Sequence, residues 1–360
     1  MIILRGTESV SQNLCVKLSD RLASLNECKG DVRQAMTRVL ESGLTVLGPE
    51  VDAFEGAFAR WLGVGAAVGV SSGTDAVMVA LQVAGVRSGD RVVVDALASG
   101  ASLVALTRLG AQPVRADVER ATLTLAPAAL EDILARESVQ AVLVTHRDGH
   151  PADLPALKAL CDAHRVALVE DCTEALGAAQ GGRRVGCVGV SAAFCFGPER
   201  TLAALGRAGL VTCAQAEGGG ALRTVRDTLL DCPMDSLQAA VLRAQLRGVD
   251  GAILRRQSIA LRYDTALGPL GVVIPTERSS ATHAYCRYVI RVADPQPVRA
   301  ALAALGLGEE ALWPFGTVAD PLMPVAAQAV QQGIAVPVYP QLPAEHQRAV
   351  IAAIASAVRA

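Results

Sequence analysis

Residues 66–84 read AAVGVSSGTDAVMVALQVA and place a strand, a turn and a helix in direct succession. Ala66–Val70 is a short apolar run of the kind that forms a buried strand. Ser71–Asp75 has the composition of a turn, and Ala76–Ala84 continues as an apolar helix. A glycine turn between a strand and a helix points free N–H groups at an anion. We therefore expect an α/β fold with an anion-binding turn, and an ordinary tight turn with Thr74 near the helix cap is the alternative.

The same alternation of short apolar strands and helices extends from residue 31 to residue 212. Apolar strands separated by helices indicate βαβ units, and hence a mainly parallel sheet covered on both faces. The expected helices are 31–46, 50–62, Ser102–Leu109, Pro127–Arg136 and Leu154–His164, and the further expected strands are Arg91–Val94, Pro113–Ala116, Ala141–Thr145, Ala167–Glu170, Ser191–Phe196 and Gly209–Thr212.

The pattern changes in the last third of the chain. Residues 220–262 have a helical pattern throughout, and after them come a strand at Tyr288–Val292 and helices at Pro297–Leu305 and Arg348–Ala357. The simplest account is a large domain over residues 1–249 and a smaller α+β domain over residues 250–360.

Composition excludes several classes of protein. With 360 residues, 51% of them hydrophobic and 19% charged, the chain is able to form a sizeable core. A net charge of −2 and an aromatic content of 3% argue against a nucleic-acid partner. No apolar run has the roughly 20 residues of a membrane helix, and the N-terminus has too short an apolar core for a signal peptide. The nine cysteines show no metal-binding spacing, so we expect reduced thiols, a cytoplasmic protein and no bound metal.

A series of motifs extends along most of the chain in a fixed order. The motifs are Ser42-Gly43 with Leu47-Gly48-Pro49, Ser72-Gly73-Thr74-Asp75-Ala76, Gly110–Val114, His146 with Gly149–Asp153, Glu170–Ala175, Phe196–Leu202, Gly209–Thr212, Gln238-Ala239-Ala240 and Val336–Pro340. Together they resemble the DegT/DnrJ/EryC1/StrS family of nucleotide-sugar aminotransferases, which use pyridoxal phosphate (PLP). The resemblance runs from about residue 30 to the C-terminus. It implies the type I aminotransferase fold and a homodimer whose active sites lie at the interface.

The resemblance assigns three residues to cofactor binding in this chain. Gly73 and Thr74 match the family's phosphate cradle. Asp171 matches the acid that keeps the pyridine nitrogen protonated, and it follows a predicted strand, at the edge where open α/β sheets bind ligands. An aspartate that caps the following loop is the alternative for Asp171.

Arg200 stands where the family has the lysine that forms a Schiff base with PLP. A lysine amine is able to lose its proton and attack an aldehyde, whereas a guanidinium stays protonated and forms no such bond. The only lysines of the chain are Lys17, Lys29 and Lys158, and none follows a strand that would direct it into the site. A family branch with 3-dehydratase activity has histidine at this position and uses the pyridoxamine form (PMP), but arginine is a poorer acid–base group than histidine.

Other positions also depart from the family pattern. Ser99 replaces an aromatic residue that stacks on the cofactor, Cys195 replaces a phosphate-binding serine, and Glu174 replaces a glutamine. Asp231 and Pro233 stand near positions where asparagine and arginine are common. Lost stacking and lost phosphate hydrogen bonds together cost about 4–8 kcal/mol of binding free energy. We therefore expect that no cofactor is bound, with non-covalent PLP or PMP as the alternative.

Three functions remain open at this point. The first is a PLP-independent enzyme in which Arg200 binds a small anionic sugar-, nucleoside- or amino-acid-type substrate, Glu174 or His146 acts as acid or base, and Asp171 and Glu199 complete the cluster. A core histidine satisfied by backbone groups is the alternative for His146. The second is a sugar aminotransferase or dehydratase that holds PLP or PMP non-covalently. The third is a non-catalytic partner of a lysine-bearing paralogue.

Overall fold

The computed structural model describes residues 15–308 and 322–359. Its largest element is a seven-stranded sheet with the strand order β1-β9-β8-β5-β4-β2-β3, in which β9 alone runs antiparallel to its neighbours. The strands are β1 (Ala66–Val70), β2 (Arg91–Asp95), β3 (Gln112–Ala116), β4 (Ala141–Thr145), β5 (Ala167–Asp171), β8 (Ser191–Cys195) and β9 (Gly209–Cys213). The expected α/β fold with a mainly parallel sheet is confirmed.

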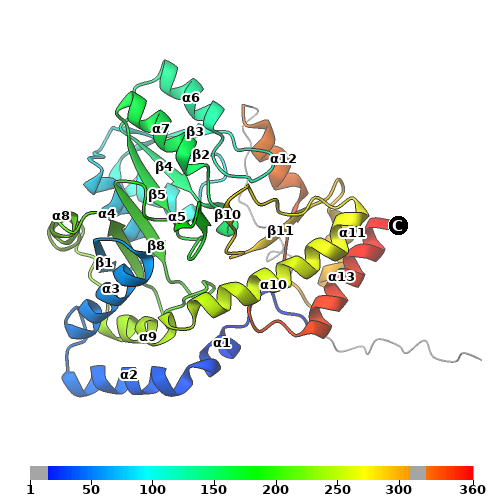
Figure 1. Cartoon of the computed structure of the whole chain (residues 1–360), viewed down its shortest axis with the longest axis horizontal. Helices are drawn as coiled ribbons and strands as arrows, with labels where there is room; N and C mark the ends of the chain where they lie inside the picture. Colours follow the sequence, from blue (N-terminus) through cyan, green and yellow to red (C-terminus); the bar gives the residue numbers. More distant parts are fainter. Residues whose placement is uncertain (1–14, 309–321, 360) are drawn as a thin grey trace, which may run out of the picture.

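Helices cover both faces of this sheet (Figure 1). One face packs against α3 (Pro49–Leu62), α6 (Pro127–Arg136), α7 (Leu154–His164) and α9 (Ser236–Leu246). The other face packs against α4 (Gly73–Val83), α5 (Gly100–Leu109) and α8 (Gly218–Thr224). A central strand enclosed in this way, such as β4, is buried on both faces, which is why its sequence reads as a continuous hydrophobic run, whereas the edge strand β3 is partly exposed and polar.

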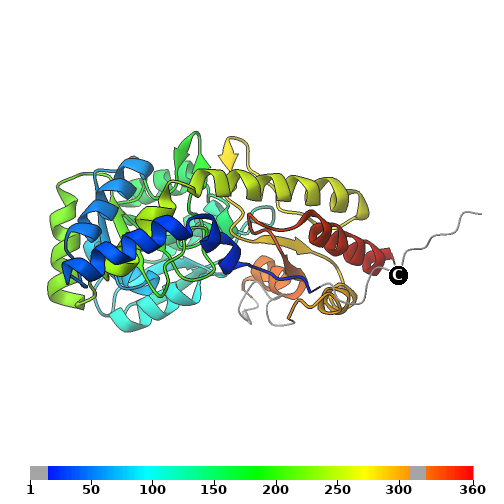
Figure 2. The same cartoon turned by 90° about the horizontal axis from the view of Figure 1, so that it is seen from below.

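The C-terminal part of the chain has a core of its own, and its elements lie to one side of the large sheet (Figure 2). A two-stranded antiparallel sheet of β11 (Tyr288–Arg291) and β12 (Gly333–Val336) packs with helices α11 (Gln296–Ala303) and α13 (Ala344–Arg359). The remaining helices are α1 (Arg21–Glu27), α2 (Lys29–Ser42), α10 (Val249–Leu267) and α12 (Pro324–Gln332), and three short strands, β6 (Ala179–Gln180), β7 (Arg183–Arg184) and β10 (Ala281–Thr282), form a third sheet.

The long helix α10 belongs to both parts of the molecule. Its first residues, Val249 and Ile253, lie in the core below the large sheet, whereas Ile259 and Leu267 lie in the C-terminal core. The expected domain boundary at residue 250 therefore falls at the start of a shared helix, and a division into two domains stays a prediction.

The structure differs from the expected elements between residues 220 and 262. The single helical stretch is broken into α8, a π-helical turn η2 (Val225–Leu230), α9 and α10. Asp231 has φ 44°, which ends the π-helical turn, and the next residues cross to the sheet, where Pro233 bridges to Val70 of β1. The break was not predicted, because the segments before and after it both have the hydrophobic spacing of an amphipathic helix.

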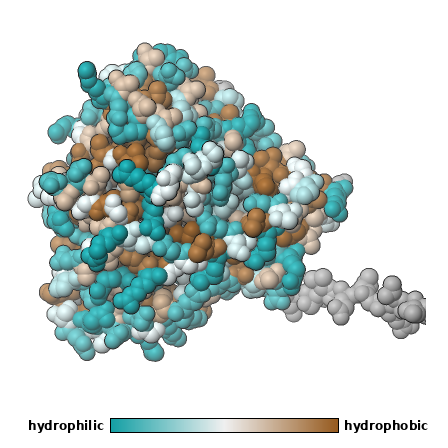
Figure 3. Space-filling model, viewed as in Figure 1, coloured by the Kyte–Doolittle hydropathy of each residue, from teal (hydrophilic) through white to brown (hydrophobic). Residues whose placement is uncertain are grey.

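The surface is consistent with the composition. On the face seen in Figure 3, hydrophilic residues surround smaller apolar patches. Within the two described ranges, no helix combines the length and the apolar character that crossing a bilayer requires.

Candidate active site

The carboxyl edge of the parallel sheet carries a fixed acidic side chain, Asp171, at the last position of β5. It pairs in register with Thr145 of β4 and Ala193 of β8, and its side chain is fully buried. Its Oδ2 accepts hydrogen bonds from the hydroxyls of Ser102 and Ser99, the latter at 3.3 Å, and its Oδ1 accepts from the Thr173 N–H at 2.9 Å. Asp171 is therefore a preorganised acceptor at the edge where open α/β sheets bind ligands.

The start of α4 forms the second part of the site. The Ser72 hydroxyl caps the helix by accepting the Asp75 N–H at 3.2 Å, and no described residue accepts a hydrogen bond from the N–H of Gly73 or Thr74. A Cβ added at Gly73 would come within 2.6 Å of the Cys195 Cβ, so the glycine lets the helix start approach the end of β8. Free N–H groups at a helix N-terminus suit a phosphate.

Arg200 lies in the loop after β8, and its side chain is directed at Glu174. The Arg200 Nη1 lies 3.5 Å from the Glu174 Oε1 and donates to the Cys286 Sγ at 3.7 Å. Burial lowers the pKa of Arg200, but Cys286 and Glu174 outweigh burial and hold the pKa above its ordinary value. The side chain is therefore a permanent cation that binds anions and transfers no proton.

Glu174 is the centre of what we call the arginine cluster, which also contains Arg147, Asp148, Arg200 and Arg287. Its side chain is only 3% exposed and pairs with all three guanidinium groups, with Arg147 at 3.6 Å. Burial raises the pKa of Glu174, but the charges of Arg287, Arg147 and Arg200 outweigh burial and hold the pKa well below its usual range. A carboxylate held in this way is a weak base at neutral pH, so its geometry suits positioning of the arginines better than general base catalysis.

The remaining members of the cluster were not found from the sequence. Arg147 and Asp148 follow β4 in a short 3-10 turn, and the Arg287 Nε lies 3.3 Å from the Asp148 Oδ1. Burial raises the pKa of Asp148, and the nearby arginines oppose this effect. The two charged residues after β4 were a usable signal, since they follow a strand at the carboxyl edge of the sheet. Arg287 gave no such signal, because it lies 113 residues from Glu174.

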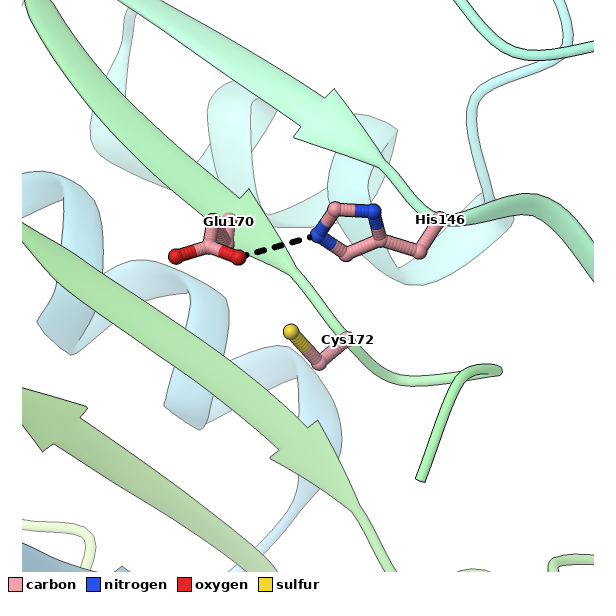
Figure 4. Close-up of side chains that lie close together, drawn as sticks. All are labelled: His146, Glu170 and Cys172. Atoms are coloured by element: carbon pink, nitrogen blue, oxygen red, sulfur yellow. Dashed lines mark hydrogen bonds and ion pairs between the residues drawn. The ribbon is translucent and has the colours of Figure 1, made fainter. Parts of the chain in front are cut away.

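The His146 side chain makes no hydrogen bond or ion pair with the arginine cluster in the described residues and pairs instead with Glu170 (Figure 4). Its Nδ1 accepts the Ala152 N–H at 3.0 Å, so its Nε2 carries the proton and donates to the Glu170 Oε2 at 3.1 Å. Glu170 and Asp171 are adjacent on β5 and point to opposite faces of the sheet, so the His146 side chain faces away from Asp171. The proposed acid–base role for His146 lacks geometric support, because both ring nitrogens are engaged in a buried network.

The same network includes a possible metal-ligand set that the protein itself satisfies. Ligand atoms of His146, Glu170 and Cys172 all lie within 4.8 Å of one another. Glu170 already accepts three backbone N–H groups, from Gly186, Val188 and Gly189, each at 2.7 Å. Burial raises the pKa of the Cys172 thiol well above its ordinary value. The Glu170 carboxylate is therefore used to hold β5 against the 186–189 loop.

The other predicted site residues divide into two groups. Ser99 and Cys195 lie in the site, beside Asp171 and Gly73 respectively. Glu199 is exposed and makes no ion pair in the described part of the chain, so it does not join the cluster as we expected. Its position in a tight turn explains this, because the Arg200 N–H donates to the Gly197 carbonyl and turns Glu199 outward.

The site fits the two ends of a pyridoxamine or pyridoxal phosphate. The N-terminus of α4 offers N–H groups for a phosphate, and Asp171 offers a carboxylate for a protonated ring nitrogen. All three lysines of the chain are described and lie elsewhere: Lys17 and Lys158 form surface ion pairs with Asp20 and Asp162, and Lys29 is exposed.

The chain is similar to known proteins over most of its length. The family model "DegT/DnrJ/EryC1/StrS aminotransferase family" matches residues 26–355. The chain is 35% identical to the erythromycin biosynthesis sensory transduction protein EryC1 of Saccharopolyspora erythraea, over 94% of this chain and 98% of that protein. It is 32% identical to a dTDP-3-amino-3,4,6-trideoxy-alpha-D-glucose transaminase of Streptomyces venezuelae, over 91% of this chain and 92% of that protein.

Solved structures share the fold over nearly the whole chain. The S. venezuelae DesV structure, in complex with a ketimine intermediate, superposes with a TM-score of 0.87 at 30% identity and covers 95% of this chain and 98% of that one. The Bacillus subtilis NtdA structure, with bound cofactor PMP, has a TM-score of 0.85 at 20% identity and covers 98% of this chain and 87% of that one.

These findings overturn one expectation. We expected that no cofactor is bound, on the strength of the altered residues around Arg200. The related transaminases, and the structures that hold a ketimine intermediate or PMP, contradict that expectation. The sum of lost contacts misled because it left out the N–H groups and the carboxylate that remain in place at Gly73, Thr74 and Asp171. The chain belongs to the DegT/DnrJ/EryC1/StrS aminotransferase family.

Proposed function

We propose that this chain is a sugar aminotransferase or dehydratase that holds PMP or PLP without a covalent bond to the polypeptide. The observation that carries the proposal is the pairing of an anion cradle at Gly73 and Thr74 with the buried carboxylate of Asp171, in a site where the nearby cation is Arg200 and not a lysine. The names of the relatives support a nucleotide-linked amino or keto sugar as the substrate.

Each residue has a defined role in this proposal. The N–H groups of Gly73 and Thr74 bind the phosphate, and the Asp171 Oδ1 and Oδ2 accept the hydrogen bond of the protonated ring nitrogen. The bound cofactor supplies an electron sink next to the nitrogen-bearing carbon. Ser102 and Ser99 keep the Asp171 carboxylate in place, and Arg200 binds an anionic group of a substrate while Glu174 fixes its direction.

The cofactor part is tested by calorimetric titration of the purified chain with PMP and PLP. We expect binding of both, and we expect Asp171→Asn to weaken it about tenfold or more, because a charge-assisted hydrogen bond is worth about 1.5–3 kcal/mol. Asp162→Asn is the matched control, since Asp162 lies on the surface of α7 and pairs with Lys158. A wild-type chain that binds neither form contradicts the proposal.

The absence of a covalent bond is tested by borohydride reduction and mass spectrometry. After loading with PLP, the wild-type chain is expected to keep its mass, whereas Arg200→Lys is expected to gain the mass of one reduced cofactor, because an amine replaces the guanidinium. A cofactor adduct on any lysine of the wild-type chain would exclude this proposal. Transfer of an amino group to a nucleotide-linked keto sugar then tests the reaction itself.

A further inference from the structure

Cys286 is a half-buried thiol at the edge of the candidate active site, just before β11. Its Sγ accepts a hydrogen bond from the Arg200 Nη1 at 3.7 Å. Five of the nine cysteines of the chain are fully buried, and burial keeps a thiol away from reagents in solution. Cys286 differs from them because it combines access to solvent with a direct contact to a cation.

Arg256 of α10 is a second cation that lies against Cys286. Its residue is 6% exposed, and its Nη1 donates to the carbonyl oxygens of Tyr285 at 3.0 Å, Cys286 at 3.3 Å and Val338 at 3.3 Å. Within residues 15–308 and 322–359, no carboxylate lies within ion-pair distance of this guanidinium, and its Nε finds no hydrogen-bond acceptor. Because a buried charge is costly unless it is paired, Arg256 favours a negative charge close to it.

The sulfur of Cys286 is the ionisable group that these cations share. Burial lowers the pKa of Arg256, and the charge of Cys286 opposes this effect. Arg287, the next residue along the chain, is also close, but it is paired with Glu174, as Arg200 is. The argument therefore rests on Arg200, which contacts the sulfur, and on Arg256, which no carboxylate neutralises in the part of the chain that the structure describes. Cations beside a thiol stabilise the thiolate, which is its nucleophilic form.

We propose that Cys286 is a reactive thiol, a modification site at which a peroxide oxidises the chain to a sulfenic acid. In this step the thiolate sulfur attacks one peroxide oxygen, so that an S–O bond forms and the O–O bond breaks. The sulfur is oxidised and the peroxide is reduced, and the hydroxide that leaves takes up a proton from solvent and becomes water. The modified sulfur lies beside Arg200, so the oxidation changes the surroundings of a residue of the candidate active site. The step itself needs no cofactor, so it does not rest on the proposed function.

The test treats the full chain with hydrogen peroxide at pH 7 in the presence of dimedone, which traps sulfenic acids, and follows each cysteine peptide by mass spectrometry. Cys28 is the matched control thiol, because it is also half-buried but has acidic neighbours. Burial raises the pKa of Cys28, and the charges of Asp31 and Glu27 raise it further. We expect trapping at Cys286 to be about tenfold or more faster than at Cys28, because the thiolate is the form that reacts.

Variants then assign the reactivity to the two cations. Arg200→Gln and Arg256→Gln are each expected to slow trapping at Cys286 about threefold or more, since each removes a positive charge beside the sulfur. Arg136→Gln, at an exposed arginine of α6, should leave the rate unchanged. A rate at Cys286 no higher than that at Cys28 overturns the proposal, and so does an unchanged rate in Arg200→Gln. If Arg256→Gln does not fold, Arg200→Gln decides alone, because the Arg200 side chain is 25% exposed and its loss leaves no buried carbonyl without a donor.

Discussion

Glu174 is the residue on which three guanidinium groups converge, and its removal is expected to be costly. Glu174→Gln leaves Arg147, Arg200 and Arg287 without their shared counter-charge, so we expect a loss of about 3–5 kcal/mol of unfolding free energy. The measurement is urea denaturation at pH 7. Glu137→Gln, which removes the half-exposed partner of Arg91, is expected to cost no more than about 1 kcal/mol. Equal losses of unfolding free energy in the two variants would show that the buried arginine cluster contributes no more to stability than a surface ion pair.

The same residue sets a dependence on pH. The pKa of Glu174 is lowered on folding, so its contribution is present above its ordinary pKa of 4.5 and is lost as the pH falls through the folded value. The stability difference between the wild type and Glu174→Gln should therefore shrink in acid, below about pH 4.5.

Asp95 should show the opposite dependence. Burial raises its pKa from 3.8 to about 6, against the opposing effects of Arg147 and Thr145. The folded state then holds the proton more tightly, so stability falls as the pH rises from about 4 to about 6, by about 3 kcal/mol at 1.36 kcal/mol per pKa unit. Asp95→Asn removes this cost, and its stability advantage over the wild type should grow over that window. Parallel stability curves from pH 4 to pH 8 would contradict the role of Asp95.

Sequence reasoning found part of the candidate site, but it missed Arg147 and Asp148 after β4 and Arg287, which only a tertiary contact brings to Glu174. The family resemblance assigned Gly73 and Asp171 to the site, and Arg200 and Glu174 were expected in one charged cluster, where they lie 3.5 Å apart. His146 belongs to the same series of motifs, but its side chain pairs with Glu170. Because neighbouring residues of a strand point to opposite faces of the sheet, this pairing places His146 on the face away from Asp171.

At the scale of elements, the start of α4 depends on a glycine that only the packing explains. Gly73 and Gly100 are both the first residues of helices that follow a serine cap. A Cβ at Gly73 would lie 2.6 Å from the Cys195 Cβ, whereas a Cβ at Gly100 meets nothing within 4 Å. Gly73→Ala is therefore expected to destabilise the chain by about 1–3 kcal/mol and to weaken PMP binding.

Gly100→Ala is the control for this prediction. It is expected to leave stability unchanged or raise it by about 0.4–1 kcal/mol, because alanine restricts the unfolded chain. Thermal unfolding and PMP titration of both variants provide the comparison. A Gly73→Ala variant that is as stable as Gly100→Ala and binds PMP normally would contradict the prediction, because it would show that Cys195 at the end of β8 moves to accommodate the added methyl group.

Local patterns predicted elements well and connections poorly. The helix Pro127–Arg136 and the strand Ala141–Thr145 were predicted with their observed bounds. The antiparallel direction of β9 was not predicted, because a short apolar run has the same hydrophobic pattern whether the strand is parallel or antiparallel to its neighbours. Strand β12 was also not predicted, because it is short and its partner strand β11 is distant in the sequence. In the pairing, Arg291 lies opposite Gly333, 42 residues later.

At the scale of the whole molecule, α10 joins two cores that the sequence suggested were separate. Val249 and Ile253 pack in the core of the large sheet and Ile259 in the C-terminal core, so a rotation of one part against the other would have to bend or move this helix. The candidate active site therefore lies in a framework that the shared helix supports.

The family resemblance implies a homodimer, and we expect its interface to include the end of α2 and the residues that follow it. Leu40 is 68% exposed, and Leu44 and Val46, which follow it, are each 51% exposed. Neighbouring exposed apolar side chains are typical of an interaction surface. We expect light scattering to show a dimer for the wild type and a monomer for Leu40→Asp combined with Leu44→Asp. Leu261→Asp on α10, where Leu261 is 65% exposed, should remain dimeric, and a monomeric wild type would refute the prediction.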